Sequence, residues 1–401
     1  MRAELKQAVI LAGGMGTRLG GISRDCPKPI LPVAGKPFLS YLIENLRRYG
    51  IRDFVVCVGH LGEKVIDTLG DGSALGVRIS YSIENVPLGT GGCVKNAGEL
   101  LDNQFLMLNG DTLFDFNYSD LLSKYSEKFS DGILMALRRV ENVSRYGAIK
   151  LEDYRIVSFQ DKALEGPGWI NGGVYVMKRA TIEGFPYGNF SIENDYFPSL
   201  ATHGKLYGAK YDGFFIDIGI PETYESAQLL IPERCKRPIA FLDRDGVINV
   251  NHGYVVSPDR FDLIPGALEA IRHFNENGYY VLVVTNQAGI ARGYYSELQF
   301  HDFMNWVQLE LRKHGAHFDG YYFSPNHPEG TIDRYSKSCF FRKPNPGMLL
   351  RGLSEWPTFK EESFLIGDKE SDVLAAEKAG IKGYLFEEEN LYSFCKGSGL
   401  I

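Results

Sequence analysis

The stretch AVILAGGMGTRL, residues 8–19, decides the fold of the first half of the chain. Its first four residues are apolar and predict a buried strand, and the three glycines behind them let the backbone come close to a ligand. The N–H groups of such a loop can converge on phosphate oxygens, whose charge Arg18 would neutralise. The spacing matches neither the GxxxxGK[ST] of a P-loop nor the GxGxxG of a dinucleotide-binding fold. The stretch therefore predicts a strand that leads into a phosphate-binding loop, with a plain strand-to-helix turn as the alternative.

Further apolar runs of strand length follow, with helical stretches between them, at residues 54–58, 105–108, 240–242, 281–284 and 363–366. This alternation is typical of parallel-sheet α/β architecture. Several of the runs end in Gly or Asp, at the sheet edge where open α/β sheets bind their ligands. A chain of 401 residues is also too long for a single core. We predict two α/β domains, residues 1–231 and 239–401, joined by a linker at 232–238 that carries two prolines.

The composition is that of a folded globular protein, with 44% hydrophobic and 23% charged residues. A net charge of -7 argues against binding to nucleic acid, which needs a concentrated basic face. The six cysteines form no CxxC pair, so reduced thiols and a cytoplasmic location are expected. The apolar stretch at residues 8–12 is too short for a signal peptide or a membrane span, so no membrane partner is expected. A homo-oligomer stays open.

Downstream of Arg18, the stretch PKPILP (residues 27–32) holds Lys28 between two prolines that stiffen its backbone. The pair of motifs, GGxGTRL and then PKP, resembles the sugar-1-phosphate nucleotidyltransferase family, and the likeness runs through most of the first half. It implies a Rossmann-like, glycosyltransferase-A-like mixed sheet. It also implies that Gly13, Gly14 and Arg18 cradle a nucleoside triphosphate whose phosphates Lys28 contacts.

Two aspartates at predicted strand ends are candidates for a metal site. Asp111 follows the apolar run 105–108, and Asp217 lies in the later stretch FIDIG, residues 215–219. Carboxylate oxygens suit Mg²⁺, although either aspartate alone is more often a turn or helix-cap residue. The family resemblance implies that Asp111 and Asp217 hold Mg²⁺ against the α-phosphate of the triphosphate.

The same resemblance implies binding residues for the base and the sugar. The stretch 84–92 resembles the lining of a nucleobase pocket, with a plain glycine-rich turn as the alternative, and Glu193 resembles the residue that binds sugar hydroxyls. The residues implied for the nucleobase and the sugar phosphate are Glu84, Gly89, Thr90, Tyr146, Gly147, Lys162 and Asn171.

The second half opens with FLDRDGV, residues 241–247, a strand that ends in two carboxylates. On an extended segment both side chains face the same way. Further signatures follow in order: TNQ at 285–287, RKP at 342–344, and Gly367-Asp368 with Asp372 downstream. Calcium loops and turns also use DxDG, but the ordered set is far more specific than any one part of it.

This set resembles the haloacid dehalogenase superfamily, which implies a Rossmannoid domain with a minimal cap. By that resemblance Asp243 is the nucleophile and Asp245 the general acid and base. Thr285 and Lys343 bind the phosphate. Asp243, Asp245 and Asp368 belong to an Mg²⁺ site, which Asp372 anchors from behind. A carboxylate can attack phosphorus only if Mg²⁺ and Lys343 screen the repulsion.

Longer matches, at residues 243–254, 285–293 and 342–348, resemble the heptose-1,7-bisphosphate 7-phosphatase family, a relative of the histidinol phosphatases. That likeness implies that Arg292 and Arg342 contact the distal phosphate or the sugar, a task for which an arginine fork is suited.

The chain departs from this family at its zinc loop. Where many members carry Cys-x-His and then Cys-x-Cys, this sequence has Ser324-Pro325-Asn326 and Cys339-Phe340-Phe341. These side chains cannot build a tetrahedral thiolate and imidazole site, so we predict no zinc, and ordinary roles for His327 and Cys339. The loop at 321–341 should then be held by the packing of its aromatic residues.

The two halves fit consecutive reactions. The first half also resembles heptose-1-phosphate guanylyltransferases at residues 84–92, 145–147 and 215–222. The resemblances together imply an enzyme that removes the 7-phosphate of heptose 1,7-bisphosphate through an aspartyl-phosphate, and then transfers GMP from GTP to heptose 1-phosphate. The product would be GDP-D-glycero-α-D-manno-heptose. One alternative is a mannose- or glucose-1-phosphate nucleotidyltransferase fused to another phosphatase, such as a histidinol-phosphatase-like one. A second is a sugar-phosphate or nucleotide sensor with one inactive domain.

Overall fold

The structure is a computed structural model that describes residues 5–14, 19–20, 26–159 and 165–401. The chain divides into two compact units, Met1–Glu233 (unit 1) and Arg234–Ile401 (unit 2). Helix α7 (Pro221–Cys235) continues through this division, so residues 232–235 of the predicted linker are helical. Within the described ranges, no helix is both long and apolar enough to cross a bilayer.

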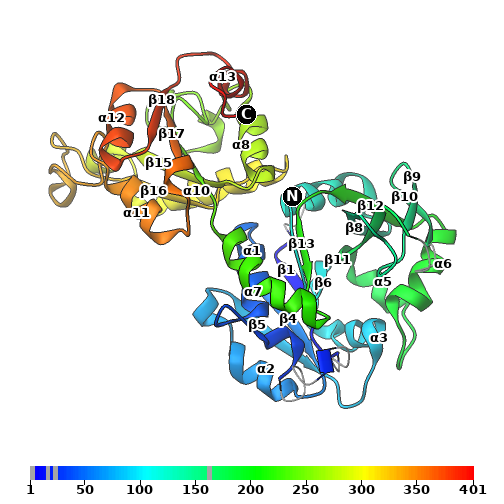
Figure 1. The fold of residues 1–401 in the computed structure, drawn as a ribbon. Coiled ribbons are helices and arrows are strands. Elements are labelled where there is room, and N and C mark those ends of the chain that lie inside the picture. The colour runs from blue at the N-terminus through cyan, green and yellow to red at the C-terminus, as the bar shows by residue number, and fades with distance from the viewer. Residues whose placement is uncertain (1–4, 15–18, 21–25, 160–164) are drawn as a thin grey trace. The chain divides into compact units, whose positions relative to one another are not determined.

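Unit 1 is built on a nine-stranded mixed sheet with the strand order β5-β4-β1-β6-β11-β8-β12-β10-β9 (Figure 1). The predicted strands at residues 8–11, 54–58 and 105–108 are its neighbouring parallel strands β1, β4 and β6. β11 runs antiparallel to both β6 and β8, which confirms the mixed sheet. The strands are β1 (Gln7–Leu11), β4 (Asp53–Val58), β5 (Arg78–Ile83), β6 (Gln104–Asn109), β8 (Ile133–Val140), β9 (Ile149–Glu152), β10 (Arg155–Phe159), β11 (Gly168–Lys178) and β12 (Leu206–Tyr211).

Two short antiparallel ladders accompany this sheet. One pairs β2 (Pro32–Val33) with β3 (Lys36–Pro37), and the other pairs β7 (Thr112–Asp115) with β13 (Phe214–Asp217). The helices are α1 (Phe38–Arg48), α2 (Gly62–Leu69), α3 (Gly89–Asn96), α4 (Tyr118–Lys124), α5 (Arg179–Glu183), α6 (Phe197–Thr202) and α7. Val94 of α3, Ile182 of α5 and Phe197 of α6 are buried in one apolar cluster with the central strands. That cluster fixes α3, whose first residues belong to the predicted nucleotide site.

Unit 2 is a five-stranded, all-parallel sheet with the order β16-β15-β14-β17-β18. Its strands are β14 (Ile239–Leu242), β15 (Tyr280–Asn286), β16 (Gly320–Ser324), β17 (Phe364–Gly367) and β18 (Lys382–Leu385). Its helices are α8 (Ala267–Glu276), α9 (Ala288–Ala291), α10 (Glu297–Arg312), α11 (Gly347–Glu355), α12 (Glu370–Ala379) and α13 (Leu391–Gly397).

Both faces of the unit 2 sheet are covered by helices (Figure 1). Ala240 and Leu242 of β14 face the cluster that contains α8, α10 and α13, whereas Ile239 and Phe241 face α11 and α12. Such strands are apolar at nearly every position, which is why they stood out in the sequence as continuous apolar runs. The sheet leaves only its strand ends for polar side chains.

Candidate active sites

In unit 1, the β7–β13 ladder brings the two candidate metal aspartates together. Asp217, the last residue of β13, pairs with Thr112, which directly follows Asp111. The ladder is extended by a hydrogen bond from the Ile218 N–H to the Asp111 carbonyl, 2.9 Å long. The two residues therefore lie at the same end of the ladder, as a shared metal ion would require.

Each of these aspartates has a cationic partner. Lys28 Nζ lies 3.2 Å from Asp111 Oδ2, and Arg145 donates to Asp217 Oδ2 over 3.0 Å. Burial raises the pKa of Asp217, and the nearby Asp111 raises it further, while Arg145 opposes both effects. A divalent cation between the two carboxylates would relieve their repulsion, so the residues fit the metal that the family resemblance implies. The family resemblance places Arg145 in the stretch 145–147, which is expected to grip the sugar phosphate, but its ion pair with Asp217 was not predicted from the sequence.

Of the other predicted sugar-side residues, Tyr146 lies beside this pair through its contact with Arg145. The Tyr146 ring lies against the guanidinium of Arg145 and edge-on to Phe215 of β13. Burial raises the pKa of the Tyr146 hydroxyl. Asn171 donates to the Tyr175 hydroxyl at 2.7 Å and accepts from the N–H of Gly173. Gly147 takes a φ of +83°. Arg18 and Lys162 lie outside the described residues, and their roles stay predictions.

The glycine-rich segment at residues 89–92 begins helix α3 and packs closely on the segment 188–193. Thr90 Oγ1 donates to Glu193 Oε2 at 2.5 Å and accepts from the Ile192 N–H at 3.0 Å. Glu193 is thus held at the start of α3. This contact joins a residue predicted for the nucleobase to one predicted for the sugar, although the two are far apart in the chain.

The close packing explains a glycine of this segment and gives a prediction. A Cβ atom at Gly91 would lie 2.1 Å from Cε2 of the Phe190 ring, which is itself buried. Gly91→Ala should therefore lower the free energy of unfolding by about 1–3 kcal/mol. The matched control is Gly98→Ala, whose Cβ would have Ile182 Cδ1 at 3.7 Å as its nearest neighbour. Urea unfolding of both variants checks this, and equal stabilities would contradict it.

Glu84 connects the glycine loop to the start of α3. Its Oε2 accepts a hydrogen bond of 3.0 Å from the Leu88 N–H, and a Cβ atom at Gly13 would lie 2.6 Å from its Oε1. Burial raises the pKa of the Glu84 carboxyl, and the bond from Leu88 opposes that rise. Gly13 must therefore stay without a side chain for Glu84 to reach this position. Gly14, by contrast, has open space around it.

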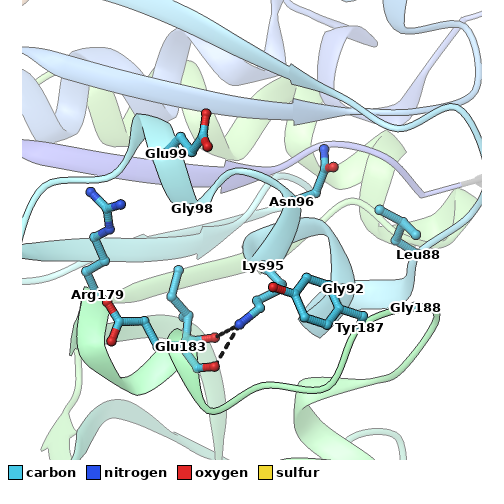
Figure 2. A pocket seen from close by; sticks show the side chains of 11 residues that line it. Leu88, Gly92, Lys95, Asn96, Gly98, Glu99, Arg179, Glu183, Tyr187 and Gly188 are labelled. Atoms are coloured by element: carbon cyan, nitrogen blue, oxygen red, sulfur yellow. Dashed lines mark hydrogen bonds between the residues drawn. The ribbon is translucent and has the colours of Figure 1, made fainter.

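A pocket of about 410 Å³ lies beside this region, between α3, α5 and Tyr187 (Figure 2). Lys95 donates to the carbonyl oxygens of Ile182 and Glu183, and its ammonium group lies 4.8 Å from the centre of the Tyr187 ring. Arg179, Glu99 and Glu183 also line the pocket, so its charges are of both signs. Leu88 and Gly92, from the stretch 84–92 predicted for the nucleobase, line the pocket, but its mixed charges favour no one class of ligand.

In unit 2, the parallel register places the four phosphatase signatures at one edge of the sheet. Leu242 pairs with Val283 on one side and with Ile366 on the other, so Asp243, Thr285 and Asp368 all follow or end neighbouring strands. Lys343 reaches the same point: its Nζ lies 2.9 Å from Asp243 Oδ2 and 2.6 Å from Asp372 Oδ1. It also donates to the Val284 carbonyl. A single buried lysine is thus shared by two buried carboxylates.

The carboxylates of Asp243, Asp368 and Asp372 form the cluster best suited to a metal among the described residues. Each contributes an oxygen, and these oxygens lie within 4.8 Å of one another. Burial raises the pKa of Asp243 to about 7, with Lys343 opposing the shift and Asp372 adding to it. Asp368 Oδ1 is buried and accepts no hydrogen bond from the part of the chain that the structure describes. A buried acceptor of this kind, beside a carboxylate whose charge is disfavoured, fits a divalent cation.

The membership of this cluster differs from the predicted metal set. Asp372, expected to anchor the site from behind, lies inside the cluster, whereas the side chain of Asp245 is held elsewhere. The amide of Gln287 donates to Asp245 Oδ2 at 3.2 Å and to Thr285 Oγ1 at 2.8 Å. Tyr295 in turn donates to Gln287 Oε1. Gln287 therefore links the predicted acid and base to a predicted phosphate ligand, a role that only its place in the TNQ motif could have suggested.

Lys343→Met gives a prediction for stability. Without the ammonium group, the carboxylates of Asp243 and Asp372 would be left buried side by side with no counter-charge, which costs about 3–5 kcal/mol of unfolding free energy. The control is Lys378→Met, because Lys378 is exposed and makes one bond, to the Pro344 carbonyl. Urea unfolding in EDTA measures both. A loss no larger than that of the control would contradict the buried triad.

A cavity of about 320 Å³ opens over this site, lined by Asp243, Asp245, Thr285, Lys343 and Tyr254 among others. Both aspartates of the DxD motif face it, although β14 ends at Leu242 and the segment beyond is not strand.

The arginines predicted to bind the distal phosphate affect one another and a nearby histidine. Burial lowers the pKa of Arg342, and the charge of Arg292 lowers it further. Burial also lowers the pKa of His327, and both arginines add to that effect. Arg292, Arg342 and His327 thus lie close to one another, but none of them lines the cavity, and their contact with a distal phosphate stays a prediction.

The loop at the zinc position is held by more than aromatic packing. Asn326, at one of the departures from the zinc motif, is buried and donates to the Tyr335 carbonyl, and Ser336 donates to the Gly330 carbonyl at 2.6 Å. Residues 321–324, predicted as loop, belong to strand β16. Tyr335 is buried, but Phe340 is 58% exposed and so contributes little to the core. The loop is therefore held partly by hydrogen bonds of its backbone, amide and hydroxyl groups, and not by the packing of aromatic rings alone.

Comparison with known proteins finds relatives of both units. Residues 7–234 match the nucleotidyl transferase family, and residues 340–390 match a HAD-hydrolase-like family. A D-glycero-beta-D-manno-heptose-1,7-bisphosphate 7-phosphatase from Rhodopseudomonas palustris is 48% identical over 161 residues, which are 40% of this chain and 89% of that protein. A D-glycero-alpha-D-manno-heptose 1-phosphate guanylyltransferase from Campylobacter jejuni is 38% identical over 225 residues, 54% of this chain and 96% of that protein. The crystal structure of HddC from Yersinia pseudotuberculosis complexed with GMP-PN matches with a TM-score of 0.52 and 34% identity, over 57% of this chain and 100% of that one.

Two α/β units, each with aspartates and a lysine gathered at strand ends, define a class of enzyme that carries out phosphate chemistry at two sites. One match spans more than half of the chain, and the phosphatase relative is matched over most of its own length. The chain belongs to the nucleotidyl transferase family and, in its second unit, to the HAD-like heptose-bisphosphate phosphatases: it is a nucleotidyltransferase fused to a phosphatase.

Proposed function

We propose that this enzyme makes GDP-D-glycero-α-D-manno-heptose in two steps, from heptose 1,7-bisphosphate and GTP, with Mg²⁺ at both sites. The observation that carries the proposal is the buried triad of Asp243, Lys343 and Asp372 beside Asp368, in a unit fused to a transferase. The names of the relatives support the sugar and the base, since one is a heptose bisphosphate phosphatase and another a heptose 1-phosphate guanylyltransferase. The six cysteines are free, which fits a reducing compartment, so we place the enzyme in the cytoplasm.

At the phosphatase site, an oxygen of Asp243 attacks the phosphorus of the 7-phosphate, and the bond from phosphorus to the C7 oxygen breaks. Asp245 donates a proton to the leaving C7 oxygen. It then takes a proton from the water that attacks the aspartyl-phosphate, which releases inorganic phosphate and restores Asp243. Asp243 and Asp368 would hold an Mg²⁺ ion, which would neutralise charge on the phosphate together with Lys343. Thr285 orients the phosphate.

At the transferase site, an oxygen of the sugar 1-phosphate attacks the α-phosphorus of GTP, and pyrophosphate leaves. The attacking oxygen is already ionised, so no general base is needed. The contribution of the protein is to hold two repelling anions in line. Lys28 and Arg145 are the described cations close to Asp111 and Asp217, and Asp111 and Asp217 would hold the Mg²⁺ that offsets the charge of the triphosphate.

The two reactions constrain the anomer. Hydrolysis at C7 leaves C1 untouched, so the phosphatase passes on the anomer that it receives. The guanylyltransferase relative is named for the alpha 1-phosphate, whereas the phosphatase relative is named for the beta bisphosphate. Because both units act in one chain, we propose that the phosphatase of this enzyme takes the α anomer.

The test supplies the enzyme with Mg²⁺, each anomer of heptose 1,7-bisphosphate and each nucleoside triphosphate in turn. Phosphate, pyrophosphate and nucleotide-sugar are measured together. We expect GDP-heptose from the α anomer and GTP. A different nucleotide-sugar would contradict the named product and favour a mannose- or glucose-type transferase. Binding of the ligands without any product would favour the sensor instead.

A further inference from the structure

A fully buried arginine lies between the two aspartates of the phosphatase motif. Arg244 has 0% relative exposure, and its side chain turns toward Asp245. One terminal nitrogen, Nη2, donates to both carboxylate oxygens, 2.8 Å to Oδ1 and 2.7 Å to Oδ2, and Nε donates to Oδ1 at 3.2 Å. The neighbouring Asp243 makes no such contact with this guanidinium among the described interactions. The guanidinium therefore holds one aspartate of the motif and not the other, whereas the backbone N–H of Arg244 donates to Asp243 Oδ1 at 2.7 Å.

The guanidinium itself is fixed in place by the fold. Nη2 also donates to the Val255 carbonyl at 2.6 Å. The rings of Phe300 and Phe303 on helix α10 lie against it, with centroids 5.6 Å and 5.3 Å from Cζ. A planar, rigid fork held at its back by aromatic rings can hold a carboxylate in one plane, which a flexible ammonium group cannot do. Helix α10 thereby fixes the Arg244 guanidinium, which in turn orients the Asp245 side chain that lines the cavity.

Two amides hold Asp245 from other directions. Asn249, which is fully buried, donates to Oδ1 at 3.1 Å, and Gln287 donates to Oδ2 at 3.2 Å. The amide of Gln287 also contacts Thr285. Asp245 nevertheless lines the cavity, with 18% of its side chain exposed. Its carboxylate is therefore held by donors from the protein side while part of its surface stays open to a substrate.

We propose that Arg244 is a positioning residue of the phosphatase reaction, which holds the Asp245 carboxylate in the orientation that serves proton transfer. The inference rests on the proposed function, because it takes Asp245 to be the general acid and base. It differs from a merely structural role, in which the buried pair stabilises the fold and any loss would affect every step alike.

Two substrates with different leaving groups separate these roles. p-Nitrophenyl phosphate releases a stable phenolate that needs no proton, whereas an alkyl phosphomonoester such as heptose 1,7-bisphosphate releases an alkoxide that does. In Arg244→Lys, the burst of p-nitrophenol in the first turnover should form at a rate within about 3-fold of wild type, because this step needs no proton from Asp245. Steady-state turnover of the same substrate should fall about 10²-fold, because the attack of water on the aspartyl-phosphate still needs Asp245 as a base. With the alkyl ester, the first turnover should fall by a similar factor of about 10², with KM changed less than about 3-fold.

A double-mutant cycle tests whether Arg244 acts through Asp245. In an Asp245→Asn background, adding Arg244→Lys should cause no further loss, because the carboxylate to be positioned is gone. The proposal is overturned if Arg244→Lys slows the p-nitrophenol burst as much as it slows steady-state turnover. It is also overturned if the variant lowers turnover by the same factor in the Asp245→Asn background as in wild type, or if it lowers turnover in neither. A wild-type enzyme that hydrolyses neither ester would contradict the proposed function instead.

Folding is controlled with further variants. Arg244→Met keeps the volume and apolar contacts of the side chain and should give the same pattern. If neither Arg244 variant shows a cooperative unfolding transition, Phe303→Leu takes their place, because it loosens the seat of the guanidinium while the charge stays. It should give the same separation of burst and turnover, and an equal loss in both would overturn the proposal.

Discussion

Asp243→Asn is expected to lower phosphate release by at least about 10⁴-fold, because the amide cannot form the aspartyl-phosphate. Asp243 is the carboxylate that Lys343 contacts at 2.9 Å and that lies with Asp368 and Asp372 in the candidate metal cluster. The change is nearly isosteric, and Lys343 keeps Asp372 as a partner. Unit 1 has its own core, so nucleotidyl transfer from heptose 1-phosphate should stay within about 2-fold of wild type.

The measurement follows inorganic phosphate and pyrophosphate in the same sample, so that each unit serves as the internal reference for the other. The matched control is Asp262→Asn: its carboxylate is 70% exposed and pairs with His252. This control should leave both activities unchanged. Phosphate release that survives Asp243→Asn would show that another group is the nucleophile.

Asp217→Asn should lower nucleotidyl transfer by about 10²–10³-fold, since it removes one of two charges that would hold Mg²⁺ at the α-phosphate. It also removes the ionised partner of Arg145, which donates to Asp217 at 3.0 Å. Pyrophosphate release at saturating Mg²⁺, GTP and heptose 1-phosphate measures the effect. Phosphate release from the bisphosphate should be unchanged.

The control for Asp217 is Asp212→Asn in the same unit, where the carboxylate is 76% exposed and lies 3.5 Å from Arg138. If Asp217→Asn keeps wild-type rates across a titration of Mg²⁺, the proposed metal site at the β7–β13 ladder is wrong. Below saturating Mg²⁺ the loss should be larger still, because a weakened site needs more metal to fill.

The fold could be predicted where local pattern and sheet position agree. Strands β1, β4, β6, β14, β15 and β17 are buried on both faces, so they appear in the sequence as continuous apolar runs, and the polar residues that end them mark the sheet edge. The boundary between the two units was harder to predict from the sequence. Pro232 suggested a linker, but it lies within α7, which runs on to Cys235.

The candidate sites were foreseen where a motif is contiguous and missed where the contact depends on tertiary structure. The sequence placed Asp243, Lys343 and Asp368 at one site, and the structure brings them together. It did not indicate that Asp372 would share the buried lysine or that Arg244 would grip Asp245. Those contacts depend on where α12 begins and on aromatic rings of α10, which are set by packing and leave no local signal. The pairing of Thr90 with Glu193 is a long-range contact of the same kind.

The division of the chain into two compact units has a consequence for metabolic flux. Every molecule carries one copy of each catalyst, so the cell cannot adjust their ratio by changing expression. The slower of the two sites then limits the pathway, and the intermediate accumulates or is depleted according to turnover numbers alone. Selection for balanced rates at the two sites must therefore act on the individual rate constants. If a variant slows one unit, the cell cannot compensate by making more of that unit alone, because every added chain also carries the other unit.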